Sequence, residues 1–337
     1  MIDVHLVMYK NTVGVIGYRN HSKKLIKILE NSPKIKRVIV YCYKKELISN
    51  LTNKNKSKKI FYTEQLSDLK KFCNLVIISS PSDTHFYYLR YFIKLKKYIF
   101  CEKPGFINKK QISFMEKLPN HIKSKIYFNY NLLHSSFYQH IKKNKNLDKE
   151  ILHMSYHSST GIAFLKKFRN NWRFTSKDIM QRITGNWGVH STNLALNIFG
   201  KLKKCFIMEK SMSSKKNIDT CSISLNFKNN TTVNIFLSYA APMNDVMTLL
   251  FKNKILKYED NKVFEYSPRN YFDKKGLFKR PPKKNLKNLN EDISNNSLER
   301  SVKYFIDLTT KNKPFPKNLF NNAIDTVKIF LKFENKN

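Results

Sequence analysis

The chain has 337 residues, of which 41% are hydrophobic, and its 63 Lys and Arg outnumber 24 Asp and Glu to give a formal net charge of +39. That length accommodates two domains of ordinary size, each with its own core. Because the sequence has no apolar run near the roughly 20 residues that span a bilayer, and no signal-peptide pattern, we expect a cytoplasmic protein without a membrane span.

The positive charge is nearly all lysine and is spread through every segment, whereas base and phosphate recognition favours the arginine fork. We therefore expect a solvated lysine surface and no nucleic-acid partner, with polyanion binding as an open alternative. The cysteines show no CxxC spacing and lie mostly in apolar runs, which indicates buried thiols and neither a disulfide framework nor a metal site; they are Cys42, Cys73, Cys101, Cys205 and Cys221.

Strand and helix patterns alternate through residues 1–130. An apolar strand from Thr12 leads through a turn at Gly17 into a helix, and further strand patterns occur at 36–43, 60–62, 75–79, 98–101 and 126–130. Helical patterns lie at 66–72, 86–95 and 109–118. This repeated alternation predicts an α/β domain with a doubly wound parallel sheet, whose ligands bind at the carboxyl ends of the strands.

Residues 131–337 show a different pattern, which predicts a second, α+β domain. Helical patterns at 137–143 and 188–199 are accompanied by closely spaced strand patterns at 151–158, 205–210, 219–227, 231–239, 246–251 and 254–259. Short turns such as 228–230 predict hairpins and hence a mostly antiparallel sheet. A long loop is expected over 269–296. Two helices follow it, at 298–310 and 319–333, and packing of these helices onto the first domain is an open alternative.

The turn at Gly17 stands where a dinucleotide-binding Rossmann fold carries its glycine-rich phosphate loop. Aligned on Gly17, the pattern G-x-G-x-x-G reads Gly17, Arg19 and Ser22, so one glycine is kept and a plain turn is the alternative. After the second strand, Tyr43-Lys44-Lys45 offers cations where an NAD-specific domain has an acid. This slightly favours NADP over NAD as the cofactor.

Several motifs follow one another along the sequence. They are Ser80-Pro81 with Thr84-His85, Cys101-Glu102-Lys103-Pro104, Phe128-Asn129-Tyr130, Trp172-Arg173, a helix from His190 to Phe199-Gly200, and the helix at 298–305. Their order and spacing resemble the glucose–fructose oxidoreductase / inositol dehydrogenase (Gfo/Idh/MocA) family over nearly the whole chain. The resemblance implies an NAD(P)-dependent enzyme that transfers hydride between nicotinamide and a secondary alcohol or ketone of a sugar or nucleotide-sugar. It also implies polysaccharide or unusual-sugar biosynthesis as the setting, and a homo-oligomer formed through an open sheet.

The resemblance assigns roles residue by residue. Lys103 and His190 match the family's catalytic positions. The residues expected to bind the cofactor are Gly17, Tyr18, Arg19, Tyr43, Lys44, Ser79, Ser80, Pro81, His85, Glu102 and Lys103. Those expected to bind the substrate are Lys103, Tyr130, Asn131, Trp172, Arg173, Asn186 and His190.

Two departures from the family pattern leave alternatives open. Asn186 and Asn193 stand where the family usually carries aspartates, and neither amide can ionise to stabilise a protonated His190. The alternative to an enzyme is therefore a catalytically silent family member that binds cofactor or sugar as a sensor or partner subunit. Biliverdin-reductase-like chemistry, and a His190 that is only packed and hydrogen-bonded, also stay open.

Overall fold

The computed structural model describes residues 11–144, 150–168, 176, 178–214 and 217–334. The chain divides into two compact units. The first runs to Tyr130 and also includes Glu299–Ile324, and the second comprises Asn131–Leu298 and the residues from Asp325 onwards.

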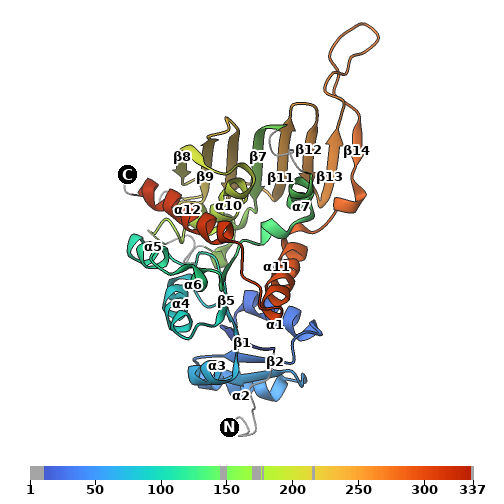
Figure 1. The fold of residues 1–337 in the computed structure, drawn as a ribbon. Helices are drawn as coiled ribbons and strands as arrows, with labels where there is room; N and C mark the ends of the chain where they lie inside the picture. Colours follow the sequence, from blue (N-terminus) through green and yellow to red (C-terminus); the bar gives the residue numbers. More distant parts are fainter. Residues whose placement is uncertain (1–10, 145–149, 169–175, 177, 215–216, 335–337) are drawn as a thin grey trace. The chain divides into compact units, whose positions relative to one another are not determined.

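The first unit is built on a six-stranded sheet in the order β3-β2-β1-β4-β5-β6 (Figure 1). Its strands, all parallel, are β1 (Thr12–Ile16), β2 (Arg37–Tyr41), β3 (Ile60–Thr63), β4 (Leu75–Ile78), β5 (Tyr98–Glu102) and β6 (Ile126–Asn129). β1 and β4 are completely buried, as expected of strands covered on both faces. The predicted doubly wound parallel sheet is confirmed, and its strand order reverses between β1 and β4, where such folds bind ligands.

The helices of this unit are α1 (Asn20–Asn31), α2 (Lys45–Lys54), α3 (Leu66–Phe72), α4 (His85–Lys94), α5 (Lys109–Glu116) and α6 (Asn120–Lys123). Most follow the apolar periodicity of the sequence, but α2 was not predicted. Its Ser, Asn and Thr residues are weak helix formers, so its amphipathic signal is obscured.

The second unit holds an eight-stranded sheet in the order β14-β13-β12-β11-β7-β10-β9-β8. The strands are β7 (Ile151–Ser159), β8 (Leu202–Lys210), β9 (Thr220–Phe227), β10 (Thr232–Ser238), β11 (Asn244–Phe251), β12 (Ile255–Glu259), β13 (Lys262–Tyr266) and β14 (Lys283–Asn285). Neighbouring strands are antiparallel except for β7 and β10, which pair in parallel. The predicted hairpin of β9 and β10 is confirmed, and so is the mostly antiparallel character of the sheet.

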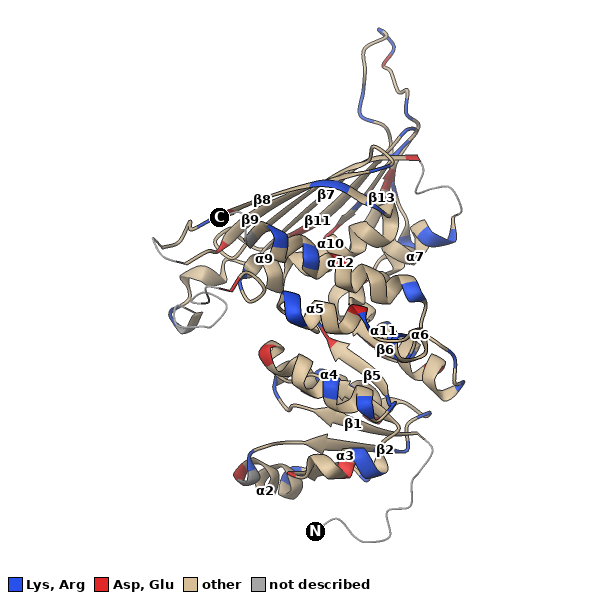
Figure 2. Cartoon of the chain, turned by 60° about the vertical axis from the view of Figure 1, so that its left-hand side comes forward, with Lys and Arg blue, Asp and Glu red and all other residues tan. Residues whose placement is uncertain are grey.

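Helices cover one face of this sheet (Figure 2). They include α7 (Ser136–Lys143), α9 (Ile183–Asn186), α10 (Gly188–Phe199) and the last turns of α12 (Lys317–Glu334). α10 is buried nearly all round because it lies between the sheet and α12: a Cβ at Gly188 would come within 2.9 Å of Ile223 and 3.5 Å of Phe330. The opposite face carries exposed apolar side chains, described below.

The segment predicted as a loop over 269–296 has more structure than expected. It contains an arm at 267–282, strand β14, a 3₁₀ turn at Lys287–Leu289 and the first turn of α11 (Ile293–Thr310), which begins five residues before its predicted start. Leu286 N–H donates to the carbonyl of Val263, and Val263 N–H donates to Asn290 Oδ1, so this stretch is fastened to β13 by hydrogen bonds.

All five cysteines are free thiols, and Cys205 alone among them is not fully buried. Among the described residues, no helix combines the length and apolar character required to cross a bilayer.

Candidate functional site

The turn after β1 approaches the end of β4 so closely that it requires glycine. Gly17 has a φ of +107°, and a Cβ at this position would lie 2.7 Å from the carbonyl oxygen of Ser79. Ser79 N–H in turn donates to Ile16 O at 3.0 Å. The turn leads directly into α1, whose first N–H groups have no partner within the helix and are suited to a phosphate.

Ser22 occupies the position of the third glycine in the dinucleotide fingerprint. Its side chain is completely buried, and its hydroxyl lies 3.0 Å from both the carbonyl oxygen and the hydroxyl of Ser79. The added hydroxyl is therefore satisfied by hydrogen bonding. The third glycine of the fingerprint normally permits close packing of the helix on the sheet. Here the hydrogen bonds between Ser22 and Ser79 allow α1 to pack closely on the end of β4.

The residues at the ends of β2 and β3 form an aromatic and cationic surface. Tyr18, beside Gly17, packs edge-on against Tyr62 with ring centroids 5.6 Å apart, and the Lys23 ammonium lies 5.2 Å from the Tyr18 ring. Tyr43 and Lys44 are both exposed, with the Lys44 ammonium 5.9 Å from the Tyr43 ring. These side chains offer hydroxyl and ammonium donors at the ends of β2 and β3.

His85 joins the loops that follow β4 and β5. Its buried ring places Nε2 2.8 Å from the Ser80 carbonyl and Nδ1 2.8 Å from the Pro104 carbonyl. Burial lowers the pKa of His85. The ring faces these two carbonyls and not the solvent, so any effect of His85 on a ligand acts through the two loops it positions.

Glu102, at the end of β5, is the centre of a buried hydrogen-bond chain. Its side chain accepts hydrogen bonds from His21 Nε2 at 2.7 Å and from Asn129 Nδ2 at 2.8 Å, and the residue is only 7% exposed. Ser301 of α11 donates to Asn129 Oδ1 at 2.7 Å, which leaves Tyr127 to donate its hydroxyl proton to Ser301. The chain thus links α1, β5, β6 and α11.

The charged groups of this hydrogen-bond network, Glu102 and His21, stabilise one another. Burial acts to raise the pKa of Glu102, but His21, Asn129 and Lys103 together hold that pKa below its ordinary value of 4.5. Glu102 in turn raises the pKa of His21 above 6.5, against the opposing effects of burial, Lys103 and Lys24.

These shifts define the pH range in which the pair stabilises the fold. The His21 contribution is complete below about pH 6.5 and is lost as the pH rises through its raised pKa. The Glu102 contribution is present above about pH 4.5 and is lost as the pH falls through its lowered pKa.

Lys103 follows Glu102 directly and is half-buried, with a cis peptide bond to Pro104. Its positive charge acts on His21, Glu102 and His85. The first unit therefore brings its predicted residues from the ends of β1, β4 and β5 to one edge of the sheet.

In the second unit, Asn186 and Trp187 of the α9–α10 region contact Tyr239. Asn186 donates to the Tyr239 hydroxyl at 3.2 Å, and the Trp187 ring stacks on Tyr239 with centroids 5.6 Å apart. His190 lies one turn further along and donates its backbone N–H to Trp187 O at 3.1 Å. Asn193 is instead fully buried, where its amide donates to Thr326 of α12.

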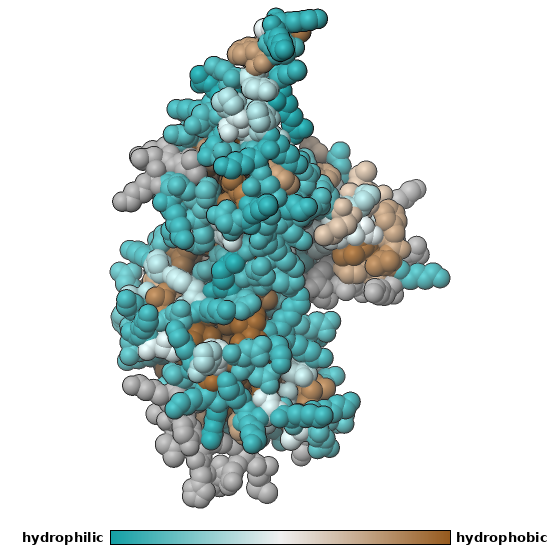
Figure 3. Space-filling model, turned by 90° about the vertical axis from the view of Figure 1, so that its right-hand side faces the viewer, coloured by the Kyte–Doolittle hydropathy of each residue, from teal (hydrophilic) through white to brown (hydrophobic). Residues whose placement is uncertain are grey.

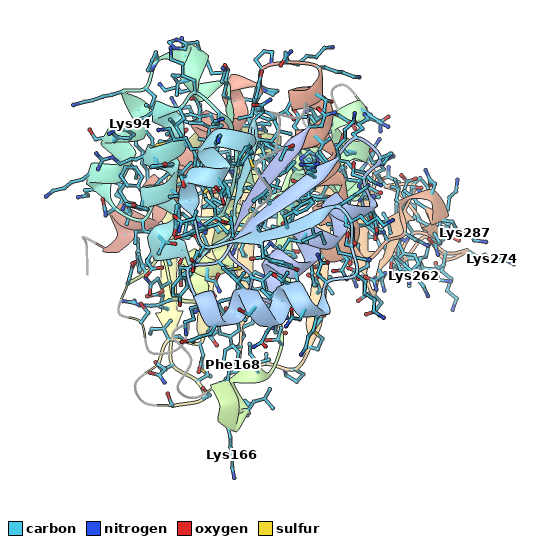
Figure 4. The ribbon with its side chains drawn as sticks, turned by 90° about the horizontal axis from the view of Figure 1, so that it is seen from below. Lys94, Lys166, Phe168, Lys262, Lys274 and Lys287 are labelled. Atoms are coloured by element: carbon cyan, nitrogen blue, oxygen red, sulfur yellow. The ribbon has the colours of Figure 1, made fainter. Side chains whose placement is uncertain are left out.

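The remaining predicted residues differ in their surroundings. Tyr130 is buried, which raises its pKa, and Asn131 donates to Ser297 at 2.8 Å. Lys166, a further candidate from the sequence for lining the substrate pocket, is exposed and projects away from the unit near Phe168 (Figure 4). Trp172 and Arg173 lie outside the described residues.

Sequence reasoning assigned no ligand or catalytic role to His21, Ser22, Asn129, Ser301 or Tyr239. His21 and Ser22 lie inside the dinucleotide fingerprint, and Asn129 lies inside a quoted motif, so a signal existed for these three. Ser301 and Tyr239 are brought to their partners only by tertiary structure.

Comparison with known proteins gives a consistent result. Residues 11–124 match the model of an oxidoreductase family with an NAD-binding Rossmann fold, and residues 150–254 match the GFO/IDH/MocA C-terminal domain. No curated protein sequence matches the chain.

Solved structures resemble the chain over almost its whole length, at identities that show the fold alone. They include UDP-N-acetylglucosamine 3-dehydrogenase from Acidithiobacillus ferrooxidans, with a TM-score of 0.73, 12% identity and 95% of each chain covered. A Gfo/Idh/MocA family oxidoreductase from Vibrio cholerae has a TM-score of 0.74, 11% identity and 97% of each chain covered. Myo-inositol 2-dehydrogenase from Lactobacillus plantarum has a TM-score of 0.74 and 15% identity, covering 97% of this chain and 98% of that one.

The pairing of His21 with Glu102 predicts a change in titration. In Glu102→Gln the carboxylate charge is lost, so the pKa of His21 is expected to fall from its raised value. NMR of the imidazole signals during a pH titration measures this. Glu30→Gln, which alters a Lys27-paired carboxylate on the same helix, is the control and should leave the His21 titration unchanged. An unaltered His21 titration in Glu102→Gln would refute the pairing.

The position of His85 predicts a loss of stability on truncation. His85→Ala removes the ring that lies between the two loop carbonyls, with its one N–H donor, and opens a cavity, which is expected to lower the free energy of unfolding by about 2–4 kcal/mol. Urea denaturation followed by circular dichroism measures the change. The exposed His121 of the same unit provides the control, because His121→Ala should alter stability by less than about 0.5 kcal/mol. Equal effects of the two variants would contradict the linking role.

Proposed function

Because the chain belongs to the Gfo/Idh/MocA oxidoreductase family, we propose that it is an NAD(P)-dependent oxidoreductase acting on a secondary alcohol or ketone of a sugar or nucleotide-sugar. The observation that carries the proposal is the edge of the parallel sheet, where the Gly17 turn touches Ser79 and the buried Glu102 precedes Lys103. The bound nicotinamide supplies the hydride chemistry.

The chain's own residues hold the cofactor. Gly17 and the start of α1 receive the pyrophosphate, with the exposed Arg19 guanidinium beside them. Lys44 at the end of β2 neutralises a 2′-phosphate, so NADP is slightly preferred over NAD. The other proposed contacts are Tyr18, Tyr43, Ser79, Ser80, Pro81 and Glu102, with His85 fixing the loops behind them.

Lys103 is the proposed catalytic residue of the first unit. Its ammonium orients the substrate oxygen and stabilises the negative charge that develops there as the hydroxyl proton leaves. His190, in the second unit, is the second proposed catalytic residue, as a proton acceptor in oxidation and a proton donor in reduction. The proposed substrate contacts are Tyr130, Asn131, Trp172, Arg173 and Asn186.

The proposed setting is polysaccharide or unusual-sugar biosynthesis. One structural relative is a dehydrogenase of UDP-N-acetylglucosamine, an anionic nucleotide-sugar. A surface with a net charge of +39 favours encounter with substrates of that charge.

A second candidate function is a catalytically silent member that binds cofactor or sugar as a sensor or partner subunit. It is favoured by the two asparagines of the second unit, because Asn186 bonds to Tyr239 and Asn193 to Thr326. Neither amide can ionise, so neither stabilises a protonated His190 as a carboxylate would. Cofactor binding without turnover of any sugar substrate would support this alternative.

We also propose that the chain forms a homo-oligomer through the open face of the eight-stranded sheet. Phe206, Met208, Phe236 and Leu250 are exposed on its strands. Burying such side chains against a second copy is favourable, because each removes apolar surface from water.

The oligomer proposal is tested by light scattering of the purified chain. The wild type is expected to be at least a dimer, and Phe206→Glu/Phe236→Glu should shift the mass towards the monomer, because buried unpaired charges are strongly unfavourable. Glutamates at two exposed positions of the first unit, Tyr87→Glu and Leu47→Glu, serve as the control. A wild-type monomer would end the proposal.

The catalytic role of Lys103 is tested with Lys103→Met, which keeps most of the side-chain length and removes the charge. Turnover of sugar and nucleotide-sugar substrates, followed by nicotinamide absorbance, is expected to fall about a hundredfold or more. NAD(P)H binding, followed by fluorescence, should weaken far less than turnover, because Lys103 is one of several proposed cofactor contacts. Lys109→Met at the exposed start of α5 is the control. Failure of the wild type to bind any nicotinamide cofactor would disprove the proposed NAD(P)-dependent activity. Unchanged turnover in Lys103→Met would disprove the proposed catalytic role of Lys103.

A further inference from the structure

An arm formed by residues 267–282 extends from the eight-stranded sheet between β13 and β14 (Figure 1). Its two sides are joined near the tip by backbone hydrogen bonds, from Lys279 N–H to Tyr271 O and from Asp273 N–H to Leu277 O, both at 2.9 Å. Phe272 and Phe278 form a bridge between the sides. The tip is therefore a defined hairpin.

Asp273 organises the turn at the end of the arm. Its Oδ1 accepts hydrogen bonds from the N–H groups of Lys275 at 2.8 Å and Leu277 at 3.0 Å. Its carbonyl accepts from Gly276, whose φ of +77° suits glycine. The carboxylate is thus engaged by the turn, which holds Leu277 at the apex.

The tip presents apolar side chains to the solvent. Phe278 is 83% exposed, Leu277 63% and Phe272 46%. The ring centroids of Phe272 and Phe278 lie 4.8 Å apart, and Leu277 directly precedes Phe278, so the three apolar residues lie together at the tip. Figure 3 shows hydrophobic atoms at this end of the arm among hydrophilic neighbours. A contiguous apolar group of this kind indicates an interaction site.

Cations surround the apolar tip. The arm contains one acid, Asp273, against five cations, namely Arg269, Lys274, Lys275, Lys279 and Arg280. Lys274 projects outward at the end of the arm (Figure 4). Basic residues at the base are held over aromatic rings, with the Arg280 guanidinium 4.8 Å from the Tyr266 ring and the Lys283 ammonium 3.7 Å from the Phe264 ring.

We propose that this arm binds the surface of an anionic lipid bilayer. Leu277 and Phe278 enter the interface, and the lysines contact the lipid headgroups. A bilayer surface offers a narrow projection both an apolar phase and a dense array of negative charge.

Two other partners fit the arm less well. A second copy of this chain carries the same net charge of +39, so repulsion opposes a contact made through the cations of the tip, unlike the apolar contact proposed for the open sheet face. A nucleic acid offers phosphates but stacks its bases on flat rings, and the apex residue is a leucine.

The test is co-sedimentation of the full chain with vesicles of phosphatidylcholine alone or mixed with phosphatidylglycerol. Binding is expected with the mixed vesicles only and should weaken as salt is added. Leu277→Ser/Phe278→Ser should weaken binding at least about tenfold, because it removes the apolar side chains that enter the interface. Lys274→Glu/Lys275→Glu should weaken binding about tenfold or more.

The matched control is Lys262→Glu/Lys287→Glu, which makes the same charge change at exposed positions outside the arm (Figure 4). It should bind nearly as the wild type does. Circular dichroism and NAD(P)H fluorescence verify that each variant is folded.

The proposal is overturned if the chain does not bind the mixed vesicles, or if the control weakens binding as much as the tip variants. Tip-dependent binding to RNA or DNA in place of vesicles would assign the arm to nucleic acid. A wild-type oligomer that the tip variants dissociate would assign it to a second copy.

Discussion

The buried carboxylate of Glu102 is the constraint on which the first unit depends. A charged group at 7% exposure is tolerated only when its partners replace the water it has lost, and those partners come from separate elements. His21 comes from α1, Asn129 from β6 and, through Asn129, Ser301 from α11. The hydrogen bonds to this one carboxylate therefore position the start of α1 and the end of β6. Lys103 is positioned with them because it directly follows Glu102.

Buried polar side chains also tie down the neighbouring strand end. Ser22 bonds to Ser79 from the side of α1, and His85 bridges Ser80 and Pro104 from the side of α4. Neither residue needs to touch a ligand to matter. Together with the glycine required at position 17, they set the separation of three loops before any ligand arrives, which is the preorganisation that binding and catalysis both require.

The parts that sequence could predict are those with strong local signals. Apolar runs separated by amphipathic helices indicated the parallel sheet, and a short turn between alternating strands indicated the β9–β10 hairpin. β13 and β14 were missed because they are short and carry lysines, and β14 has no apolar residue. Their register depends on contacts between strands such as Lys283 with Phe264. His21 and Glu102 are 81 residues apart, so their pairing depends on strand order. Asn193 stands where the family usually carries an aspartate, but its buried contact with Thr326 depends on the packing of α10 against α12 and has no local signal in the sequence.

The single parallel pairing of β7 with β10 divides the larger sheet into two antiparallel ribbons. One ribbon, β11 to β14, consists of hairpins in chain order, and the arm is the connection of its outermost pair. Residues inserted into or removed from that connection alter how far the tip reaches but leave every strand pairing in place. The arm is therefore a module whose length evolution or an engineer can adjust independently of the catalytic framework.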